Sequence, residues 1–243
     1  MVRATISEPA MSGQPLEKAE QDQARMRAPK ALLATVIFCR HGATDHHPDR
    51  FYEEGDGPSL NAEGEAQGEA LGRWFVGHGS QRSSVALERV SADALYVSPS
   101  ARTRQTARPV ERALGLDAVA VADLAERSVG RWNGRLVDDI KREDPEGWRR
   151  WKSDPTGWTP PGGESLLAFG RRIETAVAAL VARHPGGVVV LMTHVGPIRA
   201  ALGAALGCPP EHGKRFVIEP GSVTRVDYTT SWPNLVFMGV QPT

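Results

Sequence analysis

The sequence predicts an α/β fold of three layers, with a mostly parallel central sheet and helices on both of its faces. Strand-like apolar runs alternate with helix-like segments along the chain, a pattern typical of such folds. The runs 31–38 and 188–193 are apolar without interruption, as expected for strands buried on both faces. Each run is followed by a histidine with a glycine close behind, at His41 and His194. Because open α/β sheets form their sites at the carboxyl ends of strands, we expect the two histidines to face each other.

The first half of the chain contains three predicted strands and two predicted helices. After the first strand, residues 43–60 are rich in His, Pro, Gly and Asp and predict a loop. Asn61 is expected to cap a helix that ends before Gly77, because apolar residues recur there at helical spacing. The remaining predicted elements are a strand at 92–97, a helix at 101–114 and a short strand at 119–121.

The second half begins with a helical stretch, 136–153, that Pro145 and Gly147 are expected to break. Glu164 is expected to begin a long helix with an apolar inner face, and the strand 188–193 follows it. The remaining predicted elements are a helix at 197–206 and strands near 216–218, 222–228 and 235–238.

Composition narrows the class of protein. The chain has 243 residues and is 40% hydrophobic, enough for one full core. Lys plus Arg and Asp plus Glu both total 29, so no overall charge attracts nucleic acid or an anionic membrane, and neither partner is expected. No apolar run reaches the roughly 20 residues of a membrane span. Residues 1–30 are polar without an apolar signal segment and predict a disordered leader, so we expect a cytoplasmic protein whose single domain covers 31–243.

The two cysteines, Cys39 and Cys208, are too few for a disulfide framework and are expected to be reduced thiols. A metal cluster of His41, His46 and His47 is disfavoured, because no carboxylate or thiol completes a recognisable ligand set. We therefore expect neither a metal nor another cofactor.

Five polar motifs occur between residues 40 and 199, about two thirds of the chain, in an order that is more specific than any one of them. They are Arg40-His41-Gly42, Ser98-Pro99-x-x-Arg102-x-x-Gln105-Thr106-Ala107, Glu126-x-x-x-Gly130-x-Trp132-x-Gly134, Pro161-Gly162-Gly163-Glu164-Ser165, and Thr193-His194 at the end of a strand. With these motifs the sequence resembles the histidine phosphatase superfamily, the phosphoglycerate-mutase-like group.

The motif residues also suit phosphoryl transfer on chemical grounds alone. The reaction needs a nucleophile, positive charge around three equatorial oxygens, and an acid for the leaving oxygen. His41 offers an imidazole nitrogen as nucleophile. Arg40 and Arg102 can fork onto phosphate oxygens, and His194 adds a donor if it is protonated. Glu126 is the candidate acid, which would protonate the departing alkoxide and then deprotonate the attacking water.

The resemblance implies the same roles for these five residues. It also separates branches of the superfamily, because the acid phosphatase and phytase branch takes its acid from an Asp directly after the second histidine. Here that position is Val195, which leaves Glu126 as the motif-supported donor.

Substrate-binding candidates beyond the five are Thr44, His47 and Tyr52 in the first loop, and Glu164, which either braces the pocket or contacts substrate. His47 stands where relatives usually have Asn, and it can still donate to a phosphate. Val129 stands where mutases have a Tyr that helps to hold a second acidic group, so mutase activity is disfavoured.

Residues 131–160 are expected to form a small helical cap over the site. The cap holds four of the six tryptophans, together with seven basic and six acidic residues, so it is no strong attractor of anions. The tryptophans either contact an organic leaving group or only pack the cap onto the body, and the sequence does not decide between these roles.

The function predicted from the sequence is metal-independent hydrolysis of a small phosphomonoester through a phosphohistidine intermediate. Phosphoglycerate mutase is one alternative. A catalytically weak module that binds a phosphate ligand or a protein partner is another. The sequence leaves the oligomeric state open, a dimer included, and it does not name the physiological substrate.

Overall fold

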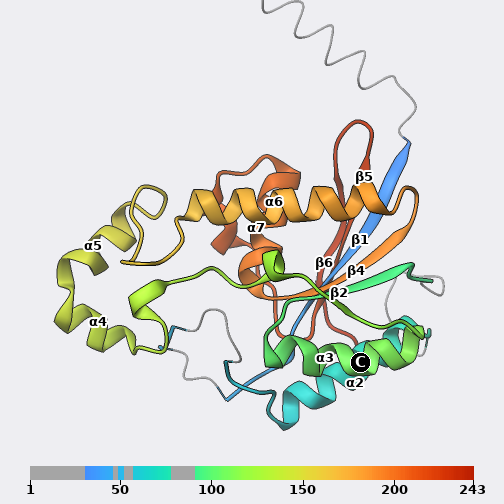
Figure 1. The fold of residues 1–243 in the computed structure, drawn as a ribbon, viewed down its shortest axis with the longest axis horizontal. Coiled ribbons are helices and arrows are strands. Elements are labelled where there is room, and N and C mark those ends of the chain that lie inside the picture. The colour runs from blue at the N-terminus through green and yellow to red at the C-terminus, as the bar shows by residue number, and fades with distance from the viewer. Residues whose placement is uncertain (1–30, 46–48, 52–56, 78–90) are drawn as a thin grey trace, which may run out of the picture.

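The computed structural model describes residues 31–45, 49–51, 57–77 and 91–243. Their centre is one six-stranded sheet in the order β3-β2-β4-β1-β5-β6 (Figure 1). The strands are β1 (Leu32–Arg40), β2 (Ala94–Val97), β3 (Val119–Ala120), β4 (Val188–Thr193), β5 (Val223–Thr229) and β6 (Asn234–Val240). The pairings from β3 to β1 are parallel, whereas β5 and β6 pair antiparallel. The sheet is therefore mixed, and its mostly parallel character is confirmed.

The two longest predicted apolar runs form adjacent central strands. β1 and β4 are parallel, and their register pairs Arg40 with Thr193 at the carboxyl ends. The backbone N–H of His41 extends this ladder by donating to the Thr193 carbonyl at 2.9 Å. Both strands are buried along most of their length because helices cover the sheet on both faces. This register brings His41 and His194 to the same point of the sheet edge.

Four helices make the outer layers. α2 (Ala62–Phe75) and α3 (Ala101–Leu114) cover one face, and α6 (Leu166–Arg183) and α7 (Val195–Leu206) cover the other (Figure 1). Leu71 of α2 packs with Ile37 of β1 in one cluster, and Ile173 of α6 packs with Val36 in the second. Each such side chain stabilises the fold by about 1.5–3 kcal/mol when it is buried. The three-layer prediction is confirmed.

Helix boundaries follow local capping. The Asn61 side chain accepts from the Gly64 N–H at 2.9 Å and caps α2, as predicted. α6 begins at Leu166 rather than at Glu164, because the Ser165 hydroxyl accepts from the Ala168 N–H at 3.0 Å and so holds the N-cap position. α7 begins at Val195, two residues before the predicted start.

The predicted strand at 216–218 is wrong. These residues follow the short 3₁₀ helix η3 (Pro210–Arg215) and join no ladder. The Phe216 carbonyl accepts from Arg199 Nε at 2.9 Å, and the Ile218 carbonyl accepts from Arg40 Nη1 at 2.5 Å. Arginine side chains therefore take the main-chain acceptors that a neighbouring strand would have used.

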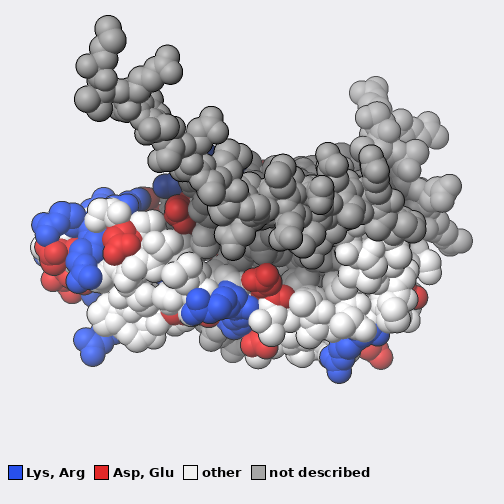
Figure 2. All heavy atoms as spheres, turned by 90° about the horizontal axis from the view of Figure 1, so that it is seen from above, with Lys and Arg blue, Asp and Glu red and all other residues white. Residues whose placement is uncertain are grey.

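The cap segment, residues 131–160, contains α4 (Val137–Glu143) and α5 (Pro145–Ser153) at the left of Figure 1. The helical stretch breaks at Asp144, directly before the predicted Pro145, which begins α5. Gly147 does not break the helix, and its N–H donates to the capping side chain of Asp144 at 2.8 Å. Two short 3₁₀ turns, η1 (Ala122–Leu124) and η2 (Gly130–Trp132), lead into the segment. Basic and acidic side chains lie side by side on this end of the molecule in Figure 2, where ion pairs such as Lys141–Asp138 link them.

The tryptophans of the cap segment form an apolar cluster of their own. Trp132 is 2% exposed, and its ring packs at 5.2–6.1 Å from the rings of Trp148, Trp151, Trp158 and Phe51. Phe51 comes from the loop after β1, so the cluster ties that loop to the cap segment.

Candidate active site

His41 is held with one defined ring nitrogen as its donor. The ring is 8% exposed, and Nδ1 lies 2.7 Å from the carbonyl oxygen of Gly42. Because a carbonyl only accepts, Nδ1 carries a proton, and in the neutral ring the lone pair is then on Nε2. Gly42 is itself fixed, since its N–H donates to Thr106 Oγ1 at 3.0 Å and a Cβ there would lie 2.4 Å from the Gly64 carbonyl oxygen. The backbone thus sets the tautomer that a nucleophilic imidazole requires.

His194 faces His41 across the junction of β1 and β4. The ring centroids are 5.2 Å apart and the planes meet at 64°. His194 Nε2 lies 2.8 Å from Ser98 Oγ, while its buried Nδ1 has no hydrogen-bond partner among the described residues. Burial lowers the pKa of His194 well below its usual value, and the electrostatic effects of the neighbouring His41, Arg102 and Arg40 lower it further. In the absence of an anion, His194 is therefore neutral near pH 7.

Two buried arginines complete the positive part of the site. Arg40 ends β1, and Arg102 projects from the first turn of α3 with 4% of its surface exposed. Burial lowers the pKa of both guanidinium groups, and the charge of Glu126 opposes that effect. Guanidinium groups remain charged despite such shifts. Two desolvated cations beside a neutral histidine form a site for an anion.

Glu126 lies in the loop between η1 and η2 and is fixed by two backbone donors. Oε1 accepts from the Arg127 N–H at 2.8 Å, and Oε2 accepts from the Gly196 N–H in the first turn of α7 at 3.0 Å. A Cβ at Gly196 would lie 1.9 Å from Glu126 Oε1. The carboxyl group therefore packs directly against the α7 backbone, and only glycine leaves room for it.

These side chains line one cavity of about 490 Å³. One end, the candidate phosphate end, is formed by Arg40, His41, Arg102 and His194, with Glu126 beside them. Its outer wall consists of residues from the first loop, the Glu126 loop, α5 and α7, among them Thr44, Arg50, Phe51, Arg127, Val129, Trp151 and Arg199. The volume falls in the range of about 300–1,000 Å³ that small ligands occupy.

Comparison with known proteins identifies the family. The model of the histidine phosphatase superfamily (branch 1) matches residues 36–241. The chain belongs to this superfamily.

Similar proteins include phosphatases. The bifunctional protein Rv2228c of Mycobacterium tuberculosis is 34% identical over 70% of this chain, which spans 44% of that longer protein. Phosphoserine phosphatase 1 of Hydrogenobacter thermophilus is 29% identical over 72% of this chain and 77% of its own length. The crystal structure of the alpha-ribazole phosphatase from Shigella flexneri superposes with a TM-score of 0.72 at 25% identity, covering 85% of this chain and 96% of that chain. These likenesses agree with membership of the histidine phosphatase superfamily.

Not every predicted site residue lines the cavity of about 490 Å³. His41, His194, Arg40, Arg102, Glu126 and Thr44 all line it. Glu164 does not, because its carboxylate pairs with Arg172 through contacts of 2.9 and 2.7 Å, and its carbonyl accepts from Arg127 Nε at 2.8 Å. Of its two predicted roles, this geometry favours bracing. His47 and Tyr52 lie outside the described residues.

Four contributors were missed by reasoning from the sequence. Ser98 orients His194, Gly196 makes room for Glu126, and Arg127 and Arg199 line the cavity. Ser98 and Gly196 both follow strand ends, which is a signal that could have singled them out. Trp151 lines the cavity and also packs against the apolar cluster of the cap segment, whereas Trp132 lies inside that cluster.

Further features bear on cofactors and membranes. Across the described ranges, no group of three His, Cys, Asp or Glu side chains is arranged to hold a metal ion. His46 and His47 fall outside those ranges. The described helices include none with the length and apolar character to cross a membrane. Cys39 is buried, and burial raises the pKa of its thiol, so it is a poor nucleophile.

Proposed function

We propose that this histidine phosphatase hydrolyses small phosphomonoesters without a metal, through a phosphohistidine formed at His41 Nε2. The observation that carries the proposal is the hydrogen bond from His41 Nδ1 to the Gly42 carbonyl. It leaves the Nε2 lone pair on a ring that lines the same cavity as Arg40, Arg102, His194 and Glu126.

In the first step His41 Nε2 attacks phosphorus and the bond from phosphorus to the leaving oxygen breaks. Arg40 and Arg102 bind the equatorial oxygens and stabilise the charge that develops on them. Glu126 acts as the general acid and gives a proton to the leaving alkoxide. The Gly42 carbonyl keeps its hydrogen bond to Nδ1–H throughout, and this bond stabilises the positive ring of the phosphohistidine.

In the second step water attacks the phosphohistidine. Glu126, now a carboxylate, accepts the proton of the water as the P–N bond breaks, which restores the acid, the neutral His41 and free phosphate. Each oxygen of Glu126 accepts one backbone N–H, and this fixes the carboxyl group for both proton transfers.

His194 adds charge when the substrate arrives. Its pKa is lowered in part by His41, Arg102 and Arg40, and a phosphate dianion between these groups offsets their effect. The Nδ1 atom of His194, buried and without a described partner, is then a donor for a phosphate oxygen. Proton uptake at His194 accordingly accompanies phosphate binding.

The wall of the cavity favours an organic leaving group. Phe51, Val129 and Trp151 give it apolar surface, and the Arg127 guanidinium stacks 4.5 Å from the centre of the Trp151 ring. Val129 is 6% exposed and offers no donor to a second acidic group. This supports hydrolysis over the mutase alternative.

The test compares His41→Asn with His212→Asn, a histidine of η3 that does not line the cavity. We expect His41→Asn to abolish turnover of a phosphomonoester panel, His212→Asn to keep the wild-type rates, and chelation with EDTA to change nothing. Rapid quenching with ³²P-labelled substrate should trap an acid-labile, base-stable phosphoprotein in wild type and His212→Asn, but not in His41→Asn. Full activity of His41→Asn, or loss of activity with EDTA, would refute the proposal.

The same panel addresses both alternatives. Isomerisation of 3-phosphoglycerate in the presence of 2,3-bisphosphoglycerate, faster than phosphate release, would establish the mutase. A blank panel with tight binding of inorganic phosphate would establish the non-catalytic binding module.

A further inference from the structure

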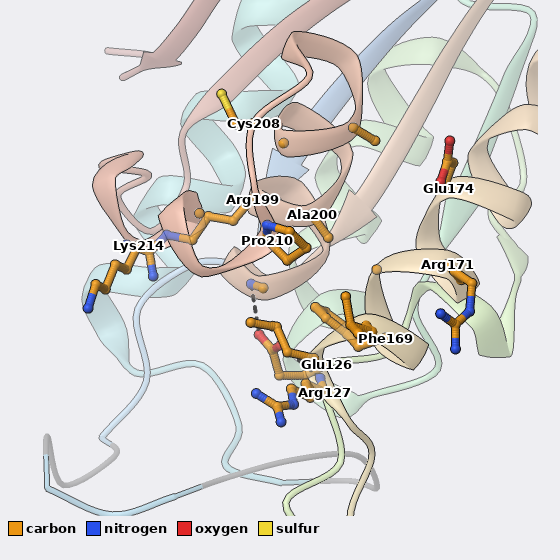
Figure 3. Close-up of a pocket in the computed structure, with 17 residues that line it drawn as sticks. Glu126, Arg127, Phe169, Arg171, Glu174, Arg199, Ala200, Cys208, Pro210 and Lys214 are labelled. Carbon is orange, nitrogen blue, oxygen red and sulfur yellow. Dashed lines mark hydrogen bonds between the residues drawn. The ribbon is translucent and has the colours of Figure 1, made fainter. Parts of the chain in front are cut away.

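A second cavity lies behind Glu126, on the side away from the phosphate end of the site. It has a volume of about 310 Å³ and lies between α6, α7 and η3 (Figure 3). Its apolar surface comes from residues such as Leu166, Phe169, Ala200 and Pro210. Its size and apolar walls are those of a small-molecule site, and the proposed phosphatase mechanism uses none of these four side chains.

Two glycines inside helices widen this cavity. Gly170 lies in α6 and Gly203 in α7, and both line the cavity. A Cβ at Gly170 would meet no atom within 4 Å, and one at Gly203 would have only an ordinary contact of 3.7 Å. Neither glycine has a positive φ, so neither the backbone nor packing requires glycine at these positions. Glycine inside a helix costs about 0.5–1 kcal/mol relative to alanine, and at both positions its effect is to keep the space open.

The catalytic acid is part of the wall between the two cavities. Glu126, Arg127, Gly196 and Arg199 line both of them. Figure 3 shows the hydrogen bond from Gly196 to Glu126 at the edge of the second cavity. The Glu126 carboxyl group packs closely against Gly196, and both residues line the two spaces. A ligand in the second cavity would touch Glu126 from behind without entering the phosphate site.

Charge at the rim favours an anion. Arg199 and Lys214 lie together at the left of Figure 3, and Arg171 lies with Glu174 at the right. Lys214 forms no ion pair with a described residue, so the excess positive charge is at the left end. Burial also lowers the pKa of Arg199, which marks this guanidinium as incompletely solvated, while the charges of Glu126 and Glu219 oppose that shift.

We propose that this cavity is a second ligand site for a small amphipathic monocarboxylate, whose apolar chain lies against Phe169 and fills the space beside Gly170 and Gly203. Its carboxylate contacts Lys214 and Arg199 at the open end. Because the chain packs against the rear of Glu126, occupancy changes the kcat of the phosphatase without competing for phosphate. The effect on kcat rests on the proposed function, whereas the binding of the monocarboxylate does not.

Binding is measured by titration calorimetry on the full chain, with octanoate as the probe and 1-octanol as the uncharged comparison. We expect octanoate to bind and vanadate, which occupies the phosphate site, not to displace it. Gly170→Leu fills the space and should weaken octanoate binding by at least about tenfold. Lys214→Glu reverses a rim charge and should weaken octanoate binding by about fivefold while leaving octanol unaffected.

Matched controls are on α2, which covers the other face of the sheet. Gly68→Ala places a Cβ 3.6 Å from Pro109, an ordinary contact, and Arg73→Glu reverses an exposed charge. Both should bind octanoate like wild type. Leucine favours helix more than glycine does, so Gly170→Leu is expected to fold, which a thermal melt checks.

Several outcomes would overturn the site: no binding of octanoate, displacement by vanadate, or unchanged affinity in Gly170→Leu. The coupling fails if saturating octanoate leaves kcat unchanged. A chain that binds octanoate as described but hydrolyses no phosphomonoester would refute the proposed function alone, because the calorimetric signal does not depend on turnover.

Discussion

Replacing Gly196 with alanine should displace Glu126, the proposed catalytic acid, while every reacting group stays in the chain. The added Cβ would lie 1.9 Å from Glu126 Oε1 and 2.7 Å from its carboxyl carbon. To reach an ordinary contact the carboxyl group must move by about 1.5 Å, and it then loses the hydrogen bond from the Gly196 N–H. The backbone of Gly196 has no positive φ, and alanine favours helix by up to about 1 kcal/mol, so α7 should form normally.

The size of the effect follows from the role of Glu126. General acid catalysis contributes about 10²–10⁴-fold, and a misplacement of about 1 Å costs on the order of 10²-fold. We therefore expect kcat of Gly196→Ala to fall by about 10²-fold on alkyl phosphates, whose alkoxide needs a proton to leave. The fall on p-nitrophenyl phosphate should be smaller, because nitrophenolate leaves readily without one.

The assay measures initial rates on both substrates, with Gly68→Ala as the control for the substitution itself. In a Glu126→Gln background, Gly196→Ala should cause almost no further loss, since both changes remove the same proton transfer. Wild-type rates on alkyl phosphates would refute the reasoning. Equal losses on the two substrates would also refute it, because they would indicate damage to the phosphate site instead.

Three other predictions concern the phosphate site, its pH dependence and the cap segment. Arg102→Lys removes the forked donor set and should lower kcat/KM by about 10²-fold in initial-rate assays, whereas Arg108→Lys, at an exposed position of the same helix, should match wild type. The pKa of His194 is lowered, so below its usual value of 6.5 the unfolded chain binds more protons than the folded one, and stability should fall as the pH drops. Urea titrations from about pH 7.5 to 5.5 should show this loss in wild type, a smaller loss in His194→Gln, and a smaller loss in wild type with saturating phosphate. Trp132→Ala should lower the free energy of unfolding by about 3–5 kcal/mol in urea titrations followed by tryptophan fluorescence, whereas Trp232→Ala, at a position 36% exposed, should have little effect.

The sheet could be predicted where burial leaves a continuous local pattern. The apolar runs of β1 and β4 identify both strands, and their ends identify His41 and His194 as neighbours. The run at 216–218 has a similar pattern but forms no strand. Its carbonyls meet arginines from β1 and α7, and that competition between distant segments leaves no local mark in the sequence.

In the site, too, residues within local motifs could be predicted, whereas residues that act through distant contacts could not. Arg40 and Arg102 stand within motifs, so their type and spacing single them out. Ser98 and Gly196 act through partners 96 and 70 residues away along the chain, His194 and Glu126 respectively. The need for glycine at Gly196 arises from a contact that exists only in the folded chain, and periodicity cannot reveal it.

The phosphate site opposes folding in the absence of its ligand. Burial lowers the pKa of Arg40, Arg102 and His194, which means that the fold disfavours the charged form of all three. Keeping these groups charged in one cavity therefore lowers the stability of the fold. The apolar clusters on the two faces of the sheet offset this cost. An oxyanion in the cavity reverses the balance because it interacts favourably with each of the three groups at once. The buried positive charges that destabilise the ligand-free protein should thus increase its affinity for phosphate. The increase should be largest when His194 is protonated.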